Sequence, residues 1–232
     1  MQVVVLSCGR SGTNMVLEIL SGSPSLIPSD VVEDKQIFRD QVAYGRVGIP
    51  DGYLTKCDTV YIDSPLQIGK TLDAYPDLKI VWTVRHPKDW VLSKLYRGRA
   101  KSSNDSPSDD ATLNGCVYDM NWMYTCYSYL KKNHGDRFIV VRMEDVINNL
   151  EYEATQMCIS LNITYDDNML NFISRMRHAG KRQRYKTLDN SQIDMWKRMY
   201  DIYDGWFKNK TEQIEVFEAV DYIVKEFGYD YE

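Results

Sequence analysis

Short apolar runs alternate with amphipathic stretches along the first two thirds of the chain. Four runs have the length and the apolar character of buried strands, and they cover residues 3–6, 59–62, 79–84 and 137–141. The stretches between them carry apolar side chains at helical spacing, and they cover residues 13–21, 65–75, 87–97 and 114–132. Strands that alternate with helices predict an α/β fold in which a central parallel sheet is flanked by helices.

The last third of the chain shows helical spacing only. Aromatic and aliphatic residues recur every three or four positions over residues 193–207 and 217–227, which predicts a helical C-terminal third. No linker divides the 232 residues, so we expect a single domain over residues 1–232. Within it, the serine- and aspartate-rich stretch around residues 100–113 predicts a flexible loop.

Composition narrows the class of protein. The net charge is −5, which argues against general nucleic-acid binding. No apolar run approaches the roughly 20 residues of a membrane span, and the opening residues lack the basic start of a signal peptide. The five cysteines are scattered without metal-ligand or disulfide spacing. We therefore expect a cytoplasmic protein.

One stretch departs from this acidic background. Residues 175–186 hold six Lys or Arg and no acidic residue. Such a cluster is typical either of a solvated basic loop or of a site for a defined polyanionic ligand. Composition leaves both interpretations open.

The turn after the first strand has the residues of an anion-binding loop. Two glycines let the backbone curl so that several N–H groups point at one anion, and the following helix adds the positive end of its dipole. The candidate cofactor-binding residues are Gly9, Arg10, Ser11, Gly12, Thr13 and Asn14. This is not a Walker A loop, because no lysine follows Gly12, and its absence weighs against an ATP or GTP kinase.

A second candidate anion site follows the run at residues 79–84. Arg85 ends that strand, Pro87 stands at the first turn of a helix, and Ser93 follows eight residues after Arg85. An arginine and a hydroxyl that converge on one point can hold a second phosphate. An isolated arginine of this kind would equally suit a salt bridge. The assignment to a phosphate site therefore depends on the presence of the first loop in the same chain.

Both segments resemble motifs of the sulfotransferase superfamily that uses 3′-phosphoadenosine-5′-phosphosulfate (PAPS). The loop at residues 9–14 is similar to its 5′-phosphosulfate loop, and YPDLKIVWTVRHPKDWVLS over residues 75–93 is similar to its 3′-phosphate motif. The pattern is closest to the glycan, protein-tyrosine and bacterial-type branches. The resemblance implies that Arg85 and Ser93 bind the 3′-phosphate of PAPS, that 3′,5′-ADP is the product, and that no metal is required.

Two weaker likenesses extend the resemblance. Residues 141–146 are similar to a segment that follows a strand in the family. We assign this segment no role in the chemistry. The loop around residues 178–190 resembles the one that closes over the nucleotide. This likeness adds three candidate cofactor contacts, Arg182, Arg184 and Lys186.

The resemblance also suggests how transfer is catalysed. Sulfuryl transfer needs charge stabilisation at the leaving phosphate, for which Arg10 is the candidate, and removal of a proton from the acceptor. The small-molecule branch takes its base from a Lys-Thr-His segment, whose place we assign to Asp63-Ser64-Pro65, without the lysine or the histidine. The other branches use a glutamate shortly after the first helix. We therefore favour Glu33 as the base and rank Asp63 second.

The sequence thus predicts a sulfotransferase that acts on a hydroxyl or amine of a small-molecule, glycan or peptide acceptor, and not on nucleic acid. Two alternatives stay open. One is a P-loop kinase for a nucleotide or small molecule, and the other is a non-catalytic nucleotide-binding module on the same fold. The identity of the acceptor and the oligomeric state do not follow from the residues.

Overall fold

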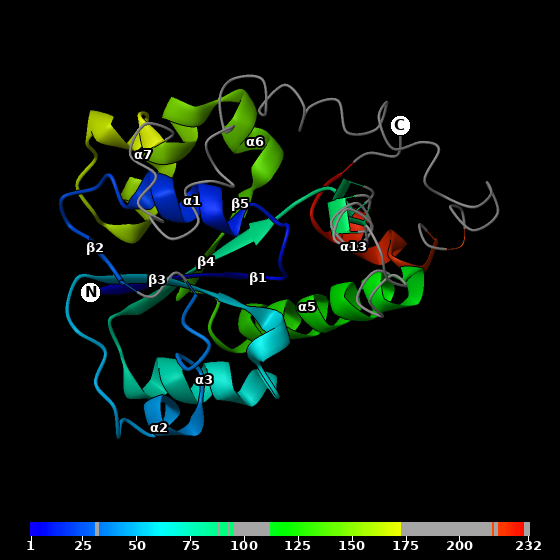
Figure 1. Cartoon of the computed structure of the whole chain (residues 1–232), viewed down its shortest axis with the longest axis horizontal. Coiled ribbons are helices and arrows are strands. Elements are labelled where there is room, and N and C mark those ends of the chain that lie inside the picture. Colours follow the sequence, from blue (N-terminus) through cyan, green and yellow to red (C-terminus); the bar gives the residue numbers. More distant parts are fainter. Residues whose placement is uncertain are drawn as a thin grey trace, which may run out of the picture.

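Parallel strands form the centre of the molecule, and their order in space differs from their order in the chain. The computed structural model describes residues 1–30, 33–87, 89–91, 93–94, 112–172, 215 and 218–229. In these ranges a five-stranded sheet has the order β2-β3-β1-β4-β5 (Figure 1). Its strands are β1 (Gln2–Ser7), β2 (Ile27–Pro28), β3 (Tyr53–Asp58), β4 (Leu78–Val84) and β5 (Phe138–Arg142). The predicted α/β fold with a central parallel sheet is confirmed.

β1 lies in the middle of this sheet. It pairs in parallel with β3 on one side and with β4 on the other. Val3 and Val5 pack into the core on one face, Val4 and Leu6 pack into the core on the other face, and all four are fully buried. A strand covered on both faces needs apolar residues at every position, which explains why this run does not alternate.

Helices cover both faces of the sheet (Figure 1). The face of Val3 and Val5 carries α1 (Thr13–Leu20), α6 (Met143–Asn148) and α7 (Leu150–Leu161). The opposite face carries α3 (Pro65–Ala74), α5 (Leu113–Asn133) and α13 (Asp221–Glu226), and α2 (Asp40–Ala43) packs against α3 on the same side. The described residues also contain the 3-10 turns η1 (Thr59–Tyr61) and η3 (Asp167–Met169).

Side-chain caps fix where two of these helices begin. Ser64 Oγ accepts a hydrogen bond from the backbone N–H of Leu66, and Pro65 occupies the first turn of α3. Thr112 Oγ1 accepts one from the N–H of Gly115 at the start of α5. Each cap satisfies a backbone donor that the helix itself leaves unpaired.

Most of the predicted elements are confirmed. The strands at residues 3–6, 79–84 and 137–141 and the helices at 13–21, 65–75 and 114–132 agree with the structure to within one residue at each end. The described part of residues 87–94 is helical as well. The helix predicted at residues 217–227 is confirmed in part by α13. The helix predicted at residues 193–207 lies outside the described residues, as do residues 100–111 and 178–190 of the two predicted loops.

The strand predicted at residues 59–62 is wrong. That segment is the turn η1, and the strand is β3, which ends at Asp58. Asp58 Oδ1 accepts a hydrogen bond from the N–H of Val60 at 3.2 Å, which starts the turn. The sequence pattern does not predict β3, because the buried Lys56 interrupts its apolar run. Lys56 Nζ donates to Glu33 Oε1 at 2.9 Å, so an ion pair takes the place of apolar burial at this position.

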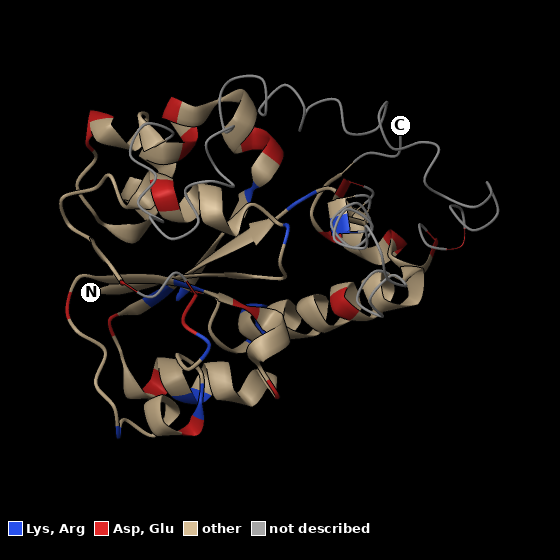
Figure 2. Cartoon of the chain, in the orientation of Figure 1, with Lys and Arg blue, Asp and Glu red and all other residues tan. Residues whose placement is uncertain are grey.

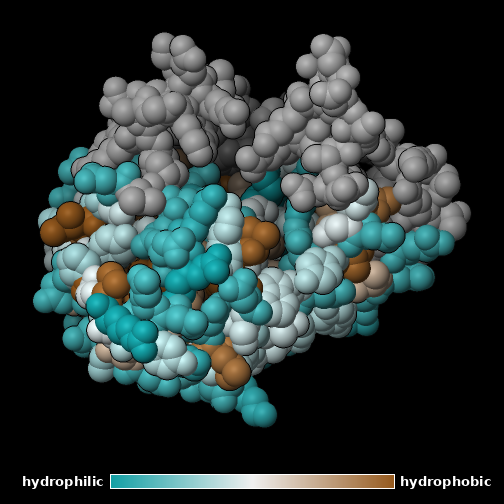
Figure 3. Space-filling model, turned by 60° about the horizontal axis from the view of Figure 1, so that its bottom comes forward, coloured by the Kyte–Doolittle hydropathy of each residue, from teal (hydrophilic) through white to brown (hydrophobic). Residues whose placement is uncertain are grey.

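The surface seen in Figure 3 is mainly polar. Hydrophobic residues stand there as separate spots among hydrophilic ones. The exposed apolar side chains of the described part include Tyr44, Val47 and Leu66. Single exposed apolar residues of this kind are ordinary for a folded protein. In the described ranges, no helix combines the length and the apolar character that a membrane span requires.

The Lys56–Glu33 ion pair should contribute more to the stability of the fold than the exposed Arg39–Asp63 pair. Lys56→Ala should lower the free energy of unfolding by about 2–4 kcal/mol, because it leaves Glu33 beside the core without its partner. Arg39→Ala should lower it by less than about 1 kcal/mol, since the side chains of the Arg39–Asp63 pair are 43% and 65% exposed. Urea unfolding measures both variants, and equal losses would contradict the role given to Lys56.

Candidate functional site

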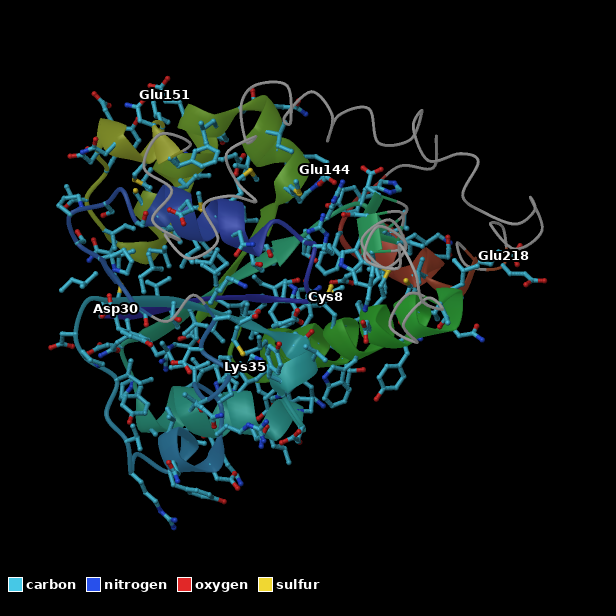
Figure 4. The ribbon with its side chains drawn as sticks, in the orientation of Figure 1. Cys8, Asp30, Lys35, Glu144, Glu151 and Glu218 are labelled. Atoms are coloured by element: carbon cyan, nitrogen blue, oxygen red, sulfur yellow. The ribbon has the colours of Figure 1, made fainter. Side chains whose placement is uncertain are left out.

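Three loops meet at one edge of the sheet. Because β1, β3 and β4 are parallel neighbours, the loops that follow them leave from the same carboxyl edge. Cys8, the first residue after β1, lies at this edge between the two layers of helices (Figure 4). Open parallel sheets bind their ligands at the carboxyl ends of the strands. The residues of these three loops therefore define the candidate site.

The loop between β1 and α1 has an unusual backbone shape. Arg10 has φ 82° and Gly12 has φ 85°, both left-handed conformations. A non-glycine residue is strained there, and such strain is frequent where a loop is shaped around a ligand. Ser11 Oγ lies 3.2 Å from Cys8 Sγ, and the N–H of Ser11 donates to the carbonyl oxygen of Cys8, which closes the turn. Gly12 caps α1 without a side-chain acceptor, so the positive end of the helix faces the loop.

The two predicted phosphate anchors come together. Arg10 Nε donates to Ser93 Oγ at 2.9 Å, and Arg85 Nη1 donates to the carbonyl oxygen of Arg10 at 3.5 Å. Trp90 Nε1 donates to the carbonyl oxygen of Gly9 at 2.7 Å. Arg85 and Ser93 are both buried. The loop after β1 and the helical segment after β4 thus form one polar, positively charged unit rather than two separate sites.

The other predicted cofactor contacts divide into two groups. Ser11 is buried in the loop, and Thr13 and Asn14 are the first two residues of α1. The structure therefore keeps residues 9–14 together around the start of that helix. The basic residues Arg182, Arg184 and Lys186 lie outside the described residues.

Positive charge gathers at this edge of the sheet (Figure 2). Arg10 follows β1, Arg85 follows β4, and Arg142 ends β5. Lys94 joins them from the segment after β4 and forms an ion pair with Asp119 of α5. Within the described ranges, no group of three or more His, Cys, Asp or Glu could hold a metal ion. The site is therefore equipped to bind anions through cationic side chains and backbone N–H groups.

A carboxylate that the sequence alone did not reveal borders the same loop. Asp58 is the last residue of β3, and a Cβ atom on Gly9 would lie 2.6 Å from Asp58 Oδ2. Burial raises the pKa of Asp58 and the charge of Glu33 raises it further, while the hydrogen bond from the Val60 N–H and the charges of Lys56 and Lys94 lower it. Asp58 went unnoticed because β3 was not predicted. A strand assignment ending at this aspartate would have revealed it.

The two carboxylates predicted as bases have other partners. Glu33 Oε1 accepts from Lys56 Nζ of β3 at 2.9 Å. Asp63 Oδ2 accepts from Arg39 Nη1 at 3.1 Å, in an exposed pair. Asp63 follows η1 rather than a strand, so the place assigned to the Lys-Thr-His segment depended on the misplaced strand. The strand that precedes β4 ends instead in Lys56-Cys57-Asp58.

A second network ties the C-terminal segment to the loop after β4. Glu144 Oε1 accepts from the backbone N–H of His86 at 2.8 Å, and Glu144 Oε2 accepts from the Tyr229 hydroxyl at 2.8 Å. Burial and the Glu144 carboxylate raise the pKa of Tyr229, so its hydroxyl stays protonated and donates. Glu144, labelled in Figure 4 at the same edge of the sheet, thereby positions the residue next to Arg85.

Comparison with known proteins identifies the family. The model of the sulfotransferase domain family matches residues 1–226 of the chain. The chain belongs to this family. As a sulfotransferase, the protein is an enzyme that transfers a sulfuryl group, and neither the kinase nor the non-catalytic alternative is favoured. A search among curated proteins found no match to this sulfotransferase.

Solved sulfotransferase structures share the fold. The sulfotransferase domain from the curacin biosynthetic pathway is 15% identical, with a TM-score of 0.64 over 100% of this chain and 98% of that chain. The sulfotransferase domain from the Synechococcus PCC 7002 olefin synthase is 16% identical, with a TM-score of 0.61 over 100% and 95% of the two chains. A retinol dehydratase in complex with retinol and PAP, which is 3′,5′-ADP, is 12% identical, with a TM-score of 0.55 over 100% and 82%.

The Glu144 network predicts a graded loss of stability. Tyr229→Phe removes one hydrogen bond to a carboxylate and should lower the free energy of unfolding by about 1–2 kcal/mol. Glu144→Ala leaves two donors without their acceptor and should lower it by about 2–4 kcal/mol. Glu218→Ala, which removes an exposed carboxylate (Figure 4), should have almost no effect.

Urea unfolding of the three variants measures this order. If Glu144→Ala lowers the free energy of unfolding no more than Glu218→Ala does, the network does not hold the C-terminal segment in place.

Proposed function

We propose that this sulfotransferase uses PAPS as its sulfuryl donor, transfers the group to a hydroxyl or amine acceptor, and releases 3′,5′-ADP. The contact between Arg10 and Ser93, with Arg85 beside it, is the observation that carries the proposal. It gathers two cations and a hydroxyl at the carboxyl edge of the sheet, which suits a nucleotide with anionic groups at two positions. On this fold, retinol dehydratase and a mouse sulfotransferase bind PAP.

The proposed ligand would use both parts of the site. Its 5′-phosphosulfate would lie on the backbone N–H groups and side chains of residues 9–14, at the positive end of α1. Its 3′-phosphate would be held by Arg85 and Ser93. Three further contacts to the nucleotide stay predictions from the sequence, those of Arg182, Arg184 and Lys186.

Arg10 is the proposed source of charge stabilisation. As the bond between sulfur and the bridging oxygen breaks, negative charge grows on the 5′-phosphate, and a guanidinium group already in place stabilises it. The carbonyl oxygen of Arg10 accepts from Arg85, which helps to hold the strained loop. Because arginine side chains supply the positive charge, the proposed reaction uses no metal ion.

The acceptor and the location of the protein are also proposals. Structures of retinol dehydratase hold retinol or androsterone, which favours a small-molecule acceptor over a glycan or a peptide. All five cysteines are free and buried, as is usual in a reducing compartment. We therefore propose a cytoplasmic enzyme that acts on a small hydroxylated molecule.

Nucleotide binding gives the first test of this function. 3′,5′-ADP should raise the melting temperature far more than 5′-AMP does, because only the former places a phosphate on Arg85 and Ser93. Arg85→Ala should remove most of this difference. Lys79→Ala is the matched control, since it deletes a cation of β4 near the opposite end of the strand. Equal shifts for the two nucleotides with the wild-type protein would contradict the PAPS proposal.

Arg10 variants test the charge on the loop. Arg10→Ala should lower kcat by about 10²-fold or more, the effect of losing one preorganised electrostatic contact. Arg10→Lys should retain much of the activity, because it keeps a cation and the same non-glycine backbone. The readout is transfer of radiolabelled sulfuryl from PAPS to a panel of small acceptors, with the exposed Arg46→Ala as control. If Arg10→Ala turns over at the normal rate, another residue provides the charge stabilisation.

A further inference from the structure

Three of the carboxylates near β3 differ in their contacts. Glu33 is engaged by Lys56 at 2.9 Å. Asp63 lies beyond η1, with its side chain 65% exposed and paired with Arg39. Of the three, only Asp58 belongs to a strand, and this strand is the direct neighbour of β1.

We propose that Asp58 is the catalytic base that removes the proton from the acceptor hydroxyl. This proposal rests on the proposed PAPS-dependent transfer. In this step the acceptor oxygen forms a bond to sulfur. The bond between sulfur and the bridging phosphate oxygen breaks, and its electron pair stays on 3′,5′-ADP. The hydroxyl proton passes to the Asp58 carboxylate, which later releases it to water.

The backbone holds Asp58 at the phosphate loop. Parallel pairing sets Asp58 opposite Ser7, the last residue of β1. Its Oδ1 accepts the N–H of Val60, so one oxygen fixes the side chain. Its Oδ2 lies so close to Gly9 that a Cβ atom there would stand 2.6 Å away. The second oxygen therefore borders the loop on which the transferred group would be bound.

The surroundings of Asp58 make its carboxylate a stronger base than an exposed one. Burial raises the pKa of this carboxyl and the charge of Glu33 adds to the effect, while the hydrogen bond from the Val60 N–H and the charges of Lys56 and Lys94 oppose it. Each of these lysines has a carboxylate of its own, since Lys56 pairs with Glu33 and Lys94 pairs with Asp119. Asp58 is thus left with a raised pKa, and a carboxylate of higher pKa is the stronger base when ionised.

Two buried thiols on which the charge of Asp58 acts do not compete for this role. Burial raises the pKa of Cys8 to about 12, and the charge of Asp58 contributes. Burial and Asp58 also raise the pKa of Cys57. Both thiols stay protonated at neutral pH, so neither accepts the proton of the acceptor.

Asp58→Asn is the deciding variant. Asparagine keeps the size of the side chain and the cap on Val60, but it is unable to accept a proton at neutral pH. Asp166→Asn is the matched control, because Asp166 caps the turn η3 in the same way, through the N–H of Asn168 at 2.8 Å. The assay follows sulfuryl transfer from labelled PAPS to phenol and to 4-nitrophenol at mildly alkaline pH, with PAPS hydrolysis by water measured in the same samples.

We expect Asp58→Asn to lower kcat with phenol or water by about 10²–10⁴-fold, the range for loss of a general base. The loss should be much smaller with 4-nitrophenol, which is already largely ionised under these conditions and needs no base. Affinity for 3′,5′-ADP should stay unchanged, and the Asp166→Asn control should keep wild-type activity. In the wild-type enzyme, kcat should fall as the pH decreases through the pKa of Asp58.

A stability readout separates a base from a structural residue. The pKa of Asp58 is higher in the folded protein than in the unfolded chain, so its charge destabilises the fold at pH values above both pKa values. Asp58→Asn should therefore melt at the same temperature as the wild type or higher at neutral pH, and this gain should vanish at acidic pH. A structural carboxylate would give a lower melting temperature instead.

Several results would overturn the proposal. One is an Asp58→Asn enzyme with nearly wild-type turnover of phenol, and another is a variant that loses 3′,5′-ADP binding along with activity. A larger loss in Glu33→Gln or in Asp63→Asn would assign the base to that residue. A wild-type protein that does not bind 3′,5′-ADP would contradict the proposed function itself. Nucleotide binding by the wild type therefore separates a wrong function from a wrong choice of base.

Discussion

The pairing of β1 with a parallel neighbour on each side is the constraint on which the site depends. It brings the ends of β3 and β4 beside the loop that follows β1. Residues that are far apart in the chain, such as Arg10 and Ser93, meet only because of this register. Residues 3–6 of the strand are apolar on both faces and fully buried, so the core that stabilises the fold also fixes the site.

Contacts between loops turn this placement into an anion site. The strained backbone of Arg10 is held by Arg85, and the carbonyl oxygen of Gly9 is held by Trp90. These contacts hold Arg10 beside Ser93, so a cation and a hydroxyl stand together at the loop. Glu144 supports the arrangement from the other side, because it binds the backbone next to Arg85.

Local patterns predicted the parts of the structure that depend on local sequence. The apolar run of β1 and the glycine turn after it belong to this class, and so does the spacing from Arg85 to Ser93. β3 was missed because Lys56 is buried only through its pairing with Glu33, a residue 23 positions away. Asp58 was missed with it. The contact between Arg10 and Ser93 spans 83 positions, and no local pattern reports such a distance.

A crystal structure of the complex with 3′,5′-ADP tests the central claim most directly. We expect the 5′-phosphate on the N–H groups of residues 9–14 and the 3′-phosphate within about 3 Å of Arg85 and Ser93. The hydrogen bond between Arg10 and Ser93 should give way to contacts with the nucleotide. A nucleotide bound at another edge of the fold, or a 3′-phosphate directed away from Arg85 and Ser93, would contradict the account.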